Sequence, residues 1–403
     1  MDGRKMSDGK RLVIGFMLLI ASARVVGQTA PPDAKPVVNI GLRTHAEWRV
    51  NVRVEFDPVG RLLILYRDNL KQSPKGNWHL LRLSAPISTE SSREELSFSI
   101  PQEPTDPDPS RRWDSFASNL LLSPDGSHAY ATFDGAVVTA KVGMPPMTDG
   151  LRNVNVSPFS SAISFDLTTF QILASTNTLP HTVSNAHRVD AEGDLLLLDA
   201  TDTDWKIAVF DSSLHQTKTT LISMATVKMV YSCQFRPDFT IECPTYNGGG
   251  NLILSADSSI QLPQSKCKME LGMPPLGVGK DETLENGLIN SDHFCTRSEA
   301  GEEQLVSPDL LPRCHQGWQA ADISSDHRAL LASCFEPGSF LDTFFYTSKA
   351  ALQVLDATTL LPRATIPLST RHRVAYAIYH HAGEAVVAVL EDGVELKVYN
   401  IPD

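Results

Sequence analysis

Residues 120–131 read Leu-Leu-Leu-Ser-Pro-Asp-Gly-Ser-His-Ala-Tyr-Ala: an apolar run, a polar turn and a second apolar run. Proline presets one backbone angle of a turn, aspartate bonds the turn's own backbone, and glycine adopts the positive φ that many turns need. Short apolar runs on either side of such a turn are typical of strands. The stretch therefore predicts a tight β-hairpin.

The same hairpin pattern recurs along the chain. Looser copies lie at 54–64, 189–197, 323–331 and 378–387, and a sixth copy spans Cys233 to Cys243. Once insertions are allowed, the copies repeat every ~45 residues, the length of one four-stranded propeller blade. Helical periodicity is missing after the N-terminal segment, so the sequence predicts an all-β fold, a β-propeller. Residues 38–403 shared among seven blades give about 52 residues each, so about seven four-stranded blades are expected, with six or eight as alternatives.

A second pattern lies between the hairpins. Short strands end in Asp166, Asp211 and Asp356, each followed by small polar residues. We interpret each aspartate as an Asx-turn residue that bonds the backbone where the outer strand passes to the next blade. The C-terminal run 394–401 is expected to close the ring.

The run from Leu122 to Thr132 resembles the repeat of bacterial YVTN-type and WD40-like propellers, and four other copies resemble it loosely. It lacks the paired Gly-His and Trp-Asp marks of true WD40 repeats. The resemblance implies an exported or periplasmic propeller in families whose roles include lactone hydrolysis, scaffolding and ligand capture. Fold alone does not choose among these roles.

The N-terminus has the pattern of a secretory signal. An apolar run from Leu12 to Ala23 is too short to span a bilayer and follows four basic residues, Arg4, Lys5, Lys10 and Arg11. Cleavage is expected after Ala23 or after Gly27, with the second preferred, and an uncleaved anchor is the alternative. No cysteine follows the run, so no lipid anchor is expected. We predict a signal peptide over 1–27, a Pro/Ala linker over 28–37 and a propeller over 38–403, secreted or periplasmic, with no membrane span after signal removal.

The cysteine count fits an oxidising compartment. An even number in an exported chain favours disulfides, although six cysteines allow 15 pairings. The cysteines are Cys233, Cys243, Cys267, Cys295, Cys314 and Cys334. A hairpin with Phe235 opposite Ile241 would bring the first two together. Residues 263–310 match the repeat poorly, so they are expected to form a degenerate blade or an insertion held by Cys267 and Cys295.

Charge and motifs narrow the function. The net charge of −12 argues against a nucleic acid or an anionic membrane surface as partner. The chain has no HExxH, Walker, GxSxG or GxGxxG motif, and its cysteine spacing does not fit zinc. The group His380, His381 and Glu384 lies in a predicted hairpin turn, so we interpret it as solvated and assign no metal site. The sequence identifies no cofactor.

Residues rich in His, Arg and Trp precede several hairpins, where we expect them to converge at one mouth of the channel. The candidate ligand-binding residues are His45, Trp48, Arg112, Trp113, His187, His315, Trp318, Arg371 and His372. Such groups suit an anionic or sugar-like ligand; the alternative is that they only pack between blades.

These features together favour a monomeric, non-catalytic module that binds a small molecule, a glycan or a protein. The alternatives are a hydrolase or lactonase at the channel mouth, with or without a divalent metal, and a purely structural scaffold.

Overall fold

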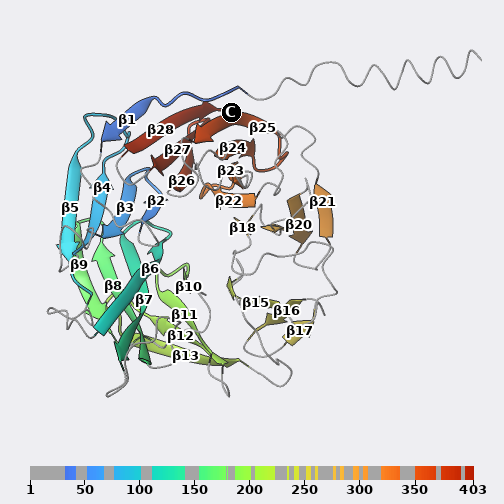
Figure 1. Ribbon diagram of the computed structural model, residues 1–403. Coiled ribbons are helices and arrows are strands. Elements are labelled where there is room, and N and C mark those ends of the chain that lie inside the picture. The colour runs from blue at the N-terminus through green and yellow to red at the C-terminus, as the bar shows by residue number, and fades with distance from the viewer. Residues whose placement is uncertain are drawn as a thin grey trace, which may run out of the picture.

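A computed structural model describes part of the chain between residues 32 and 403. The described ranges are 32–41, 52–67, 77–100, 111–140, 154–177, 179, 187–200, 205–222, 234–235, 240–244, 251–255, 259–261, 276–277, 282–285, 294–298, 303–306, 319–335, 350–368, 374–391 and 395–403. Within these ranges 28 strands and no helix form seven four-stranded antiparallel sheets. The sheets follow one another around a ring (Figure 1), which confirms the predicted all-β propeller and its blade number.

We number the blades along the chain. Blade 1 has β2 (Arg53–Phe56), β3 (Leu62–Arg67), β4 (Trp78–Leu83) and β5 (Arg93–Phe98); blade 2 has β6 (Arg111–Leu122), β7 (His128–Ala140), β8 (Val154–Asp166) and β9 (Gln171–Thr176). Blade 3 has β10 (His187–Val189), β11 (Leu195–Ala200), β12 (Trp205–Phe210) and β13 (Gln216–Ile222); blade 4 has β14 (Gln234–Phe235), β15 (Ile241–Pro244), β16 (Asn251–Leu254) and β17 (Ser259–Gln261).

Blade 5 has β18 (Leu276–Gly277), β19 (Glu282–Glu285), β20 (Phe294–Ser298) and β21 (Glu303–Val306); blade 6 has β22 (Gln319–Ile323), β23 (Ala329–Phe335), β24 (Ala350–Asp356) and β25 (Pro362–Leu368). Blade 7 has β26 (Val374–His381), β27 (Glu384–Glu391), β28 (Glu395–Pro402) and β1 (Val38–Gly41). In blades 1 to 6 the strands follow chain order from the centre of the ring outwards.

The two ends of the chain close the ring together. β28 is the third strand of blade 7, and β1 pairs with it antiparallel, Val38 opposite Val398. The expectation that the C-terminal run alone closes the ring is therefore corrected, because the outermost strand of the last blade comes from the N-terminal side. Just before β1, the backbone of Pro32 to Ala34 bonds Thr365 on β25, so part of the expected linker lies against blade 6.

The register of the inner hairpins agrees with the sequence pattern. Val54 lies opposite Ile64 in blade 1, and Ile378 lies opposite Val387 in blade 7. In blade 4 Phe235 lies opposite Ile241, as predicted. Cys233, whose pairing with Cys243 was expected from that register, lies outside the described residues.

Tight turns join the two inner strands of each well-described blade and pack against one another. In blade 1 the Asp57 carboxylate accepts hydrogen bonds from the amides of Val59 and Arg61, at 3.0 and 2.9 Å. Gly60 has a φ of 81°, and a Cβ there would lie 2.9 Å from the ring of Tyr379 in blade 7. Glycine is needed at this turn for both its conformation and its lack of a side chain.

The second pattern of aspartates forms Asx turns, but in a different place from the one expected. Asp166 accepts hydrogen bonds from the amides of Thr168 and Thr169, and Asp356 accepts them from Thr358 and Thr359. These turns join the third strand of a blade to its own outer strand rather than to the next blade. The outer strand β25 then contains a bulge opposite Val354 and Leu355, and β9 and β13 have bulges near their starts, which discourage pairing of exposed edges.

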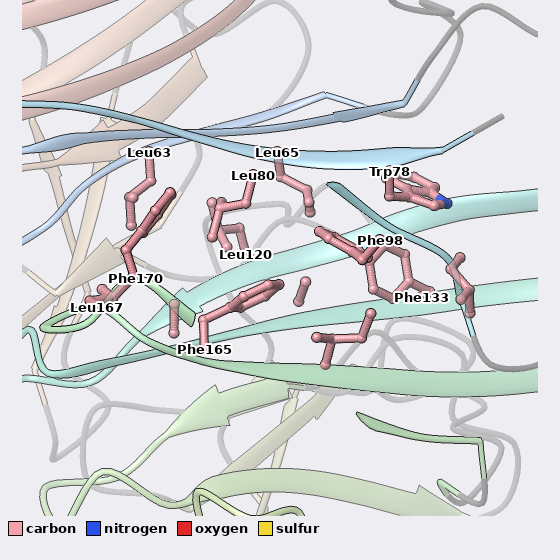
Figure 2. Packing of buried hydrophobic residues seen from close by; sticks show 14 residues of the cluster. Leu63, Leu65, Trp78, Leu80, Phe98, Leu120, Phe133, Phe165, Leu167 and Phe170 are labelled. Atoms are coloured by element: carbon pink, nitrogen blue, oxygen red, sulfur yellow. The ribbon is translucent and has the colours of Figure 1, made fainter. Parts of the chain in front are cut away.

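The core lies between neighbouring blades. Leu63, Leu65 and Leu80 of blade 1 face Phe133 and Phe165 of blade 2 (Figure 2). Trp78 is fully buried, and its ring meets Phe133 edge-on with ring centroids 4.7 Å apart. Similar clusters join blades 7 and 1, blades 6 and 7, and blades 2 and 3, so each blade is stabilised by the apolar area that it shares with its neighbours.

Two further findings concern the predicted disulfides and membrane-spanning segments. Cys334 is buried on β23 and is disulfide-bonded, while the side chains of the other five cysteines lie outside the described residues, so their pairing stays a prediction. In the described part of the chain, no helix has the length and apolar character to cross a membrane.

Candidate functional site

The inner strands surround the centre of the ring (Figure 1). β26 contacts β2 and β22, β2 contacts β6, and β6 contacts β10. Polar side chains on these short strands come from different blades yet lie near one another. Two groups of them stand out, one at blades 1, 6 and 7 and one between blades 2 and 3.

The first group, which we call the seam cluster, consists of Arg53 and Glu55 on β2, Asp322 on β22 and Tyr376 on β26. All four side chains are half-buried. A bulge between Ala320 and Asp322 interrupts the pairing of β22 with β23. Bulges redirect the side chains beside them, and here Asp322 extends from blade 6 to blade 7.

Asp322 joins two blades through backbone amides. Its Oδ1 accepts a hydrogen bond from the amide of Ile323 at 2.8 Å, and its Oδ2 accepts one from the amide of Ile378 on β26 at 3.0 Å. Burial raises the pKa of Asp322 to about 7, although these two hydrogen bonds lower it. This carboxyl group therefore exchanges its proton near neutral pH.

Glu55 has a raised pKa for related reasons. Burial is the main cause, the charge of Asp322 adds to it, and the guanidinium of Arg53 acts in the opposite direction. Burial also lowers the pKa of Arg53, against the effect of Glu55, but an arginine stays charged in a protein. Glu55 thus lies in the field of both the Arg53 guanidinium and the Asp322 carboxyl group, so the titrations of Glu55 and Asp322 depend on each other.

The second group surrounds His187, the first residue of β10 and one of the predicted site residues. Its Nδ1 lies 2.8 Å from Nδ2 of Asn119 and 2.9 Å from Oγ1 of Thr132, both in blade 2. Burial lowers the pKa of His187 to about 4, and the nearby Asp134 acts in the opposite direction. Because Asn119 Nδ2 can only donate, Nδ1 accepts, and the neutral ring carries its proton on Nε2.

Asp134 itself is buried and held in place. Ser160 on β8 donates a hydrogen bond to its Oδ1 at 2.7 Å. The His187 group therefore offers a neutral imidazole and an oriented carboxylate, whereas the seam cluster offers a guanidinium and two carboxyl groups that titrate. Such mixed donors and acceptors suit a polar ligand with several hydroxyl groups.

His187 is the only predicted ligand-binding residue whose side chain falls within the described part of the chain. Arg112 and Trp113 lie on β6 itself, opposite Val138 and Val137, rather than in a segment ahead of the inner strand; nothing is described of their side chains. The remaining six lie outside the described residues: His45, Trp48, His315, Trp318, Arg371 and His372.

The interpretation of His380 as a solvated turn residue is wrong. Its side chain is 2% exposed and lies between two carboxylates, with Nδ1 2.6 Å from Asp326 Oδ2 and Nε2 2.9 Å from Asp403 Oδ1. Arg363 binds Asp403 and Asp356 in turn. We call these five residues, which join blades 6 and 7, the rim network. His381 and Glu384 are exposed, as expected.

Sequence reasoning missed Glu55 and Asp322. Glu55 lies between Val54 and Phe56, and Asp322 directly precedes Ile323. A carboxylate at such a position was a usable signal, because acidic residues are rarely buried without a partner. Within the described residues, no group of three His, Cys, Asp or Glu side chains could hold a metal ion.

Comparisons with known proteins bear on the fold. No family model matches the sequence, and no curated protein matches it. A chain of the mitotic checkpoint complex aligns over 100% of this chain and 97% of its own, with 12% identity and a TM-score of 0.50.

Two other similar structures have slightly lower scores. Virginiamycin B lyase from Staphylococcus aureus, a catalytically inactive variant with quinupristin, covers 90% of this chain and 98% of its own at 11% identity and a TM-score of 0.48. The Swd1 β-propeller domain from Myceliophteria thermophila covers 90% and 99% at 10% identity and a TM-score of 0.48. At such identities a likeness shows the fold alone, and the chain is a β-propeller.

Proposed function

We propose that this chain is an exported, monomeric, non-catalytic binding module that takes a small, hydroxyl-rich ligand at the inner strands. The observation that carries the proposal is the seam cluster, where Arg53, Glu55 and Asp322 converge from blades 1 and 6. These three ionisable side chains are not needed for packing, since the blades are held by their shared apolar faces.

The ligand class follows from the hydrogen-bonding groups. Because their pKa values are raised, Glu55 and Asp322 offer carboxyl groups that both donate and accept hydrogen bonds, which makes a neutral polyol or sugar a better fit than the anionic ligand that remained open from the sequence. Carboxylates accept hydrogen bonds from hydroxyl groups, and a guanidinium donates two in parallel. His187, with its neutral ring, would offer a further hydrogen-bonding edge on the same ring of strands.

A hydrolase acting at the same strands is the second candidate. One observation favours it: Asp322 has a pKa of about 7, so it is able to donate and accept a proton near neutral pH. Turnover of a glycoside or lactone with loss of activity in Asp322→Asn would support this candidate over simple binding.

The test uses the full-length chain, expressed with its N-terminal segment and purified from an oxidising compartment without chelator. Native mass spectrometry detects bound molecules and the oligomeric state, and N-terminal sequencing determines whether the processed chain begins at Gln28. Thermal shift against a panel of mono- and disaccharides, and a matched panel of organic acids, then identifies the class. We expect a sugar to raise the Tm of the wild type and not that of Arg53→Met.

Glu90→Gln is the matched control, because Glu90 lies in an exposed turn of blade 1 and its removal leaves the inner strands intact. It should respond to the sugar as the wild type does. Binding of organic acids in place of sugars, or equal binding by Arg53→Met, would contradict the proposal.

A further inference from the structure

The rim network contains a histidine whose two ring nitrogens both face carboxylate oxygens. His380 Nδ1 lies 2.6 Å from Asp326 Oδ2, in the turn between β22 and β23, and its Nε2 lies 2.9 Å from Asp403 Oδ1, directly after β28. An ionised carboxylate can only accept hydrogen bonds, so each ring nitrogen has to donate one. A neutral imidazole carries a hydrogen on one nitrogen only. The two contacts are therefore made together only by an imidazolium.

Both carboxyl groups have further donors, which keep them ionised. Asp326 Oδ1 accepts hydrogen bonds from Ser324 Oγ at 2.8 Å and from a backbone amide at 3.2 Å. Asp403 Oδ1 also accepts one from Arg363 Nη1 at 2.5 Å. Burial would raise the pKa of Asp326, but its hydrogen bonds outweigh burial, and the hydrogen bond from His380 lowers the pKa of Asp403. Neither carboxyl group is therefore the source of the second proton.

The charges around the ring agree with an imidazolium. Arg363 on β25 binds Asp403 and also Asp356 at the end of β24, so the network has three carboxylates. With a neutral ring, one guanidinium would balance all three, whereas an imidazolium adds a second cation. The His380 side chain is 2% exposed, so water compensates little of the difference, and a carboxylate beside it is stabilised mainly by these cations.

We infer that His380 is a buried imidazolium whose two N–H groups join blade 6, blade 7 and the end of β28, and that this joint opens when alkali removes one of the two protons. The nitrogen that loses its proton then points a lone pair at a carboxylate oxygen, and the two repel each other. On β26 itself, Tyr379 precedes the ring and has a raised pKa, mainly through burial. His381 and Glu384 are exposed.

The sign of the effect follows from the contacts. Both carboxylates favour the charged ring in the folded chain, whereas a histidine in an unfolded chain loses its proton near pH ~6.5. The contribution of His380 to stability is therefore fully present below about pH 6.5. It is lost as the pH rises through the value at which the folded ring gives up its proton.

Nitrogen NMR of the ligand-free full chain, labelled with ¹⁵N in its histidine rings, tests the protonation state directly. At about pH 7.5, where histidines of the urea-unfolded chain are mostly neutral, both ring nitrogens of His380 should give the resonances of protonated nitrogens. The spectrum of His380→Gln identifies them by their loss. A His380 ring with one unprotonated nitrogen at this pH would overturn the inference.

Variants test the joint itself. The stability advantage of the wild type over His380→Gln, expressed as a ratio of unfolding constants, should fall at least about tenfold between pH ~6 and pH ~9, as linkage gives for each unit by which folding tightens proton binding. His381→Gln removes the exposed neighbouring ring and should stay parallel to the wild type. An advantage over His380→Gln that does not change with pH would contradict the joint, and if His380→Gln does not fold, the NMR spectrum of the wild type decides. No ligand is added, so the result is independent of whether a sugar binds.

Discussion

Asp322 and Asp326 lie four residues apart, on either side of the end of β22, yet their pKa values are shifted in opposite directions. Burial would raise the pKa of Asp326, but hydrogen bonds from Ser324, His380 and Arg328 outweigh it and lower the pKa. Asp322 has two backbone amides and no cation of its own, and burial dominates. The difference shows that charged and well-placed donors, rather than depth alone, decide whether a carboxyl group at a blade junction is ionised.

The same contrast separates the rim network from the seam cluster. At the rim, His380 and Arg363 stand between three carboxylates, Asp326, Asp356 and Asp403. At the seam, the Arg53 guanidinium acts on Glu55, and Asp322 has no cation of its own. The rim thus joins opposite charges, whereas burial at the seam raises the pKa values of both carboxyl groups.

The largest effect is expected at the rim. Asp326→Asn should lower the free energy of unfolding by about 2 kcal/mol at pH 7, because the amide accepts less strongly from Ser324 Oγ and leaves buried His380 without one of its two carboxylates. Urea denaturation measures the loss. Since the pKa of Asp326 is lowered by folding, the loss should vanish as pH falls well below 4.

Arg363→Met should cost about 1 to 1.5 kcal/mol at pH 7. The guanidinium, 14% exposed, binds Asp356 and Asp403 together and so joins β25 to the end of β28. High salt should reduce the difference in the free energy of unfolding between variant and wild type, measured by the same urea titration. A difference that salt leaves unchanged would mean that the methylene packing of Arg363, and not its charge, joins the blades.

Asp322→Asn should cost about 1 kcal/mol at pH 5, because the amide group cannot accept from both Ile323 and Ile378. At pH 8.5 the cost should shrink or reverse, as repulsion from Glu55 is removed. Thermal unfolding at the two pH values gives the sign. If Asp322→Asn and Asp326→Asn show the same trend with pH, the contrast between seam and rim is wrong.

The smallest effect is expected in the turn between β22 and β23, which contains Asp326. His327 has a φ of 58° where the matching turns have Gly60 and Gly126. His327→Gly should relieve the strain and raise stability by up to about 0.5 kcal/mol, after the entropy cost of glycine. A fall in Tm would show that contacts of the imidazole ring outweigh the strain, and Ser325→Gly in the same turn is the control.

The hairpins and the Asx turns were predictable because their signals are local. Asp57, Pro58 and Gly60 specify a turn within five residues, and repeats of that pattern set the blade number. The rim network was not predictable in this way, since His380 meets Asp326 and Asp403 from 54 and 23 residues away. A histidine beside a hairpin turn is ordinarily exposed, and only the packing of two blades buries this one.

The seam cluster shows the same limit. An alternating pattern would assign Glu55 to a solvated face of its strand, but an inner propeller strand has neighbours on both faces. Whether a charge there meets water, a cation or another acid depends on which blade follows, which the repeat does not encode.

The pairing of β1 with β28 also delays closure of the ring during synthesis. Val38 cannot pair until Val398 has been made, and at about 5 to 20 residues per second the ribosome needs roughly 20 to 70 s to make the chain between them. During that interval the early blades lack their last neighbour, and the apolar face that blade 1 shares with blade 7 stays uncovered. The final closure joins residues far apart in sequence, so it is the step whose loop entropy is greatest, and a nascent chain stalled before β28 would be a ready substrate for chaperones or proteases.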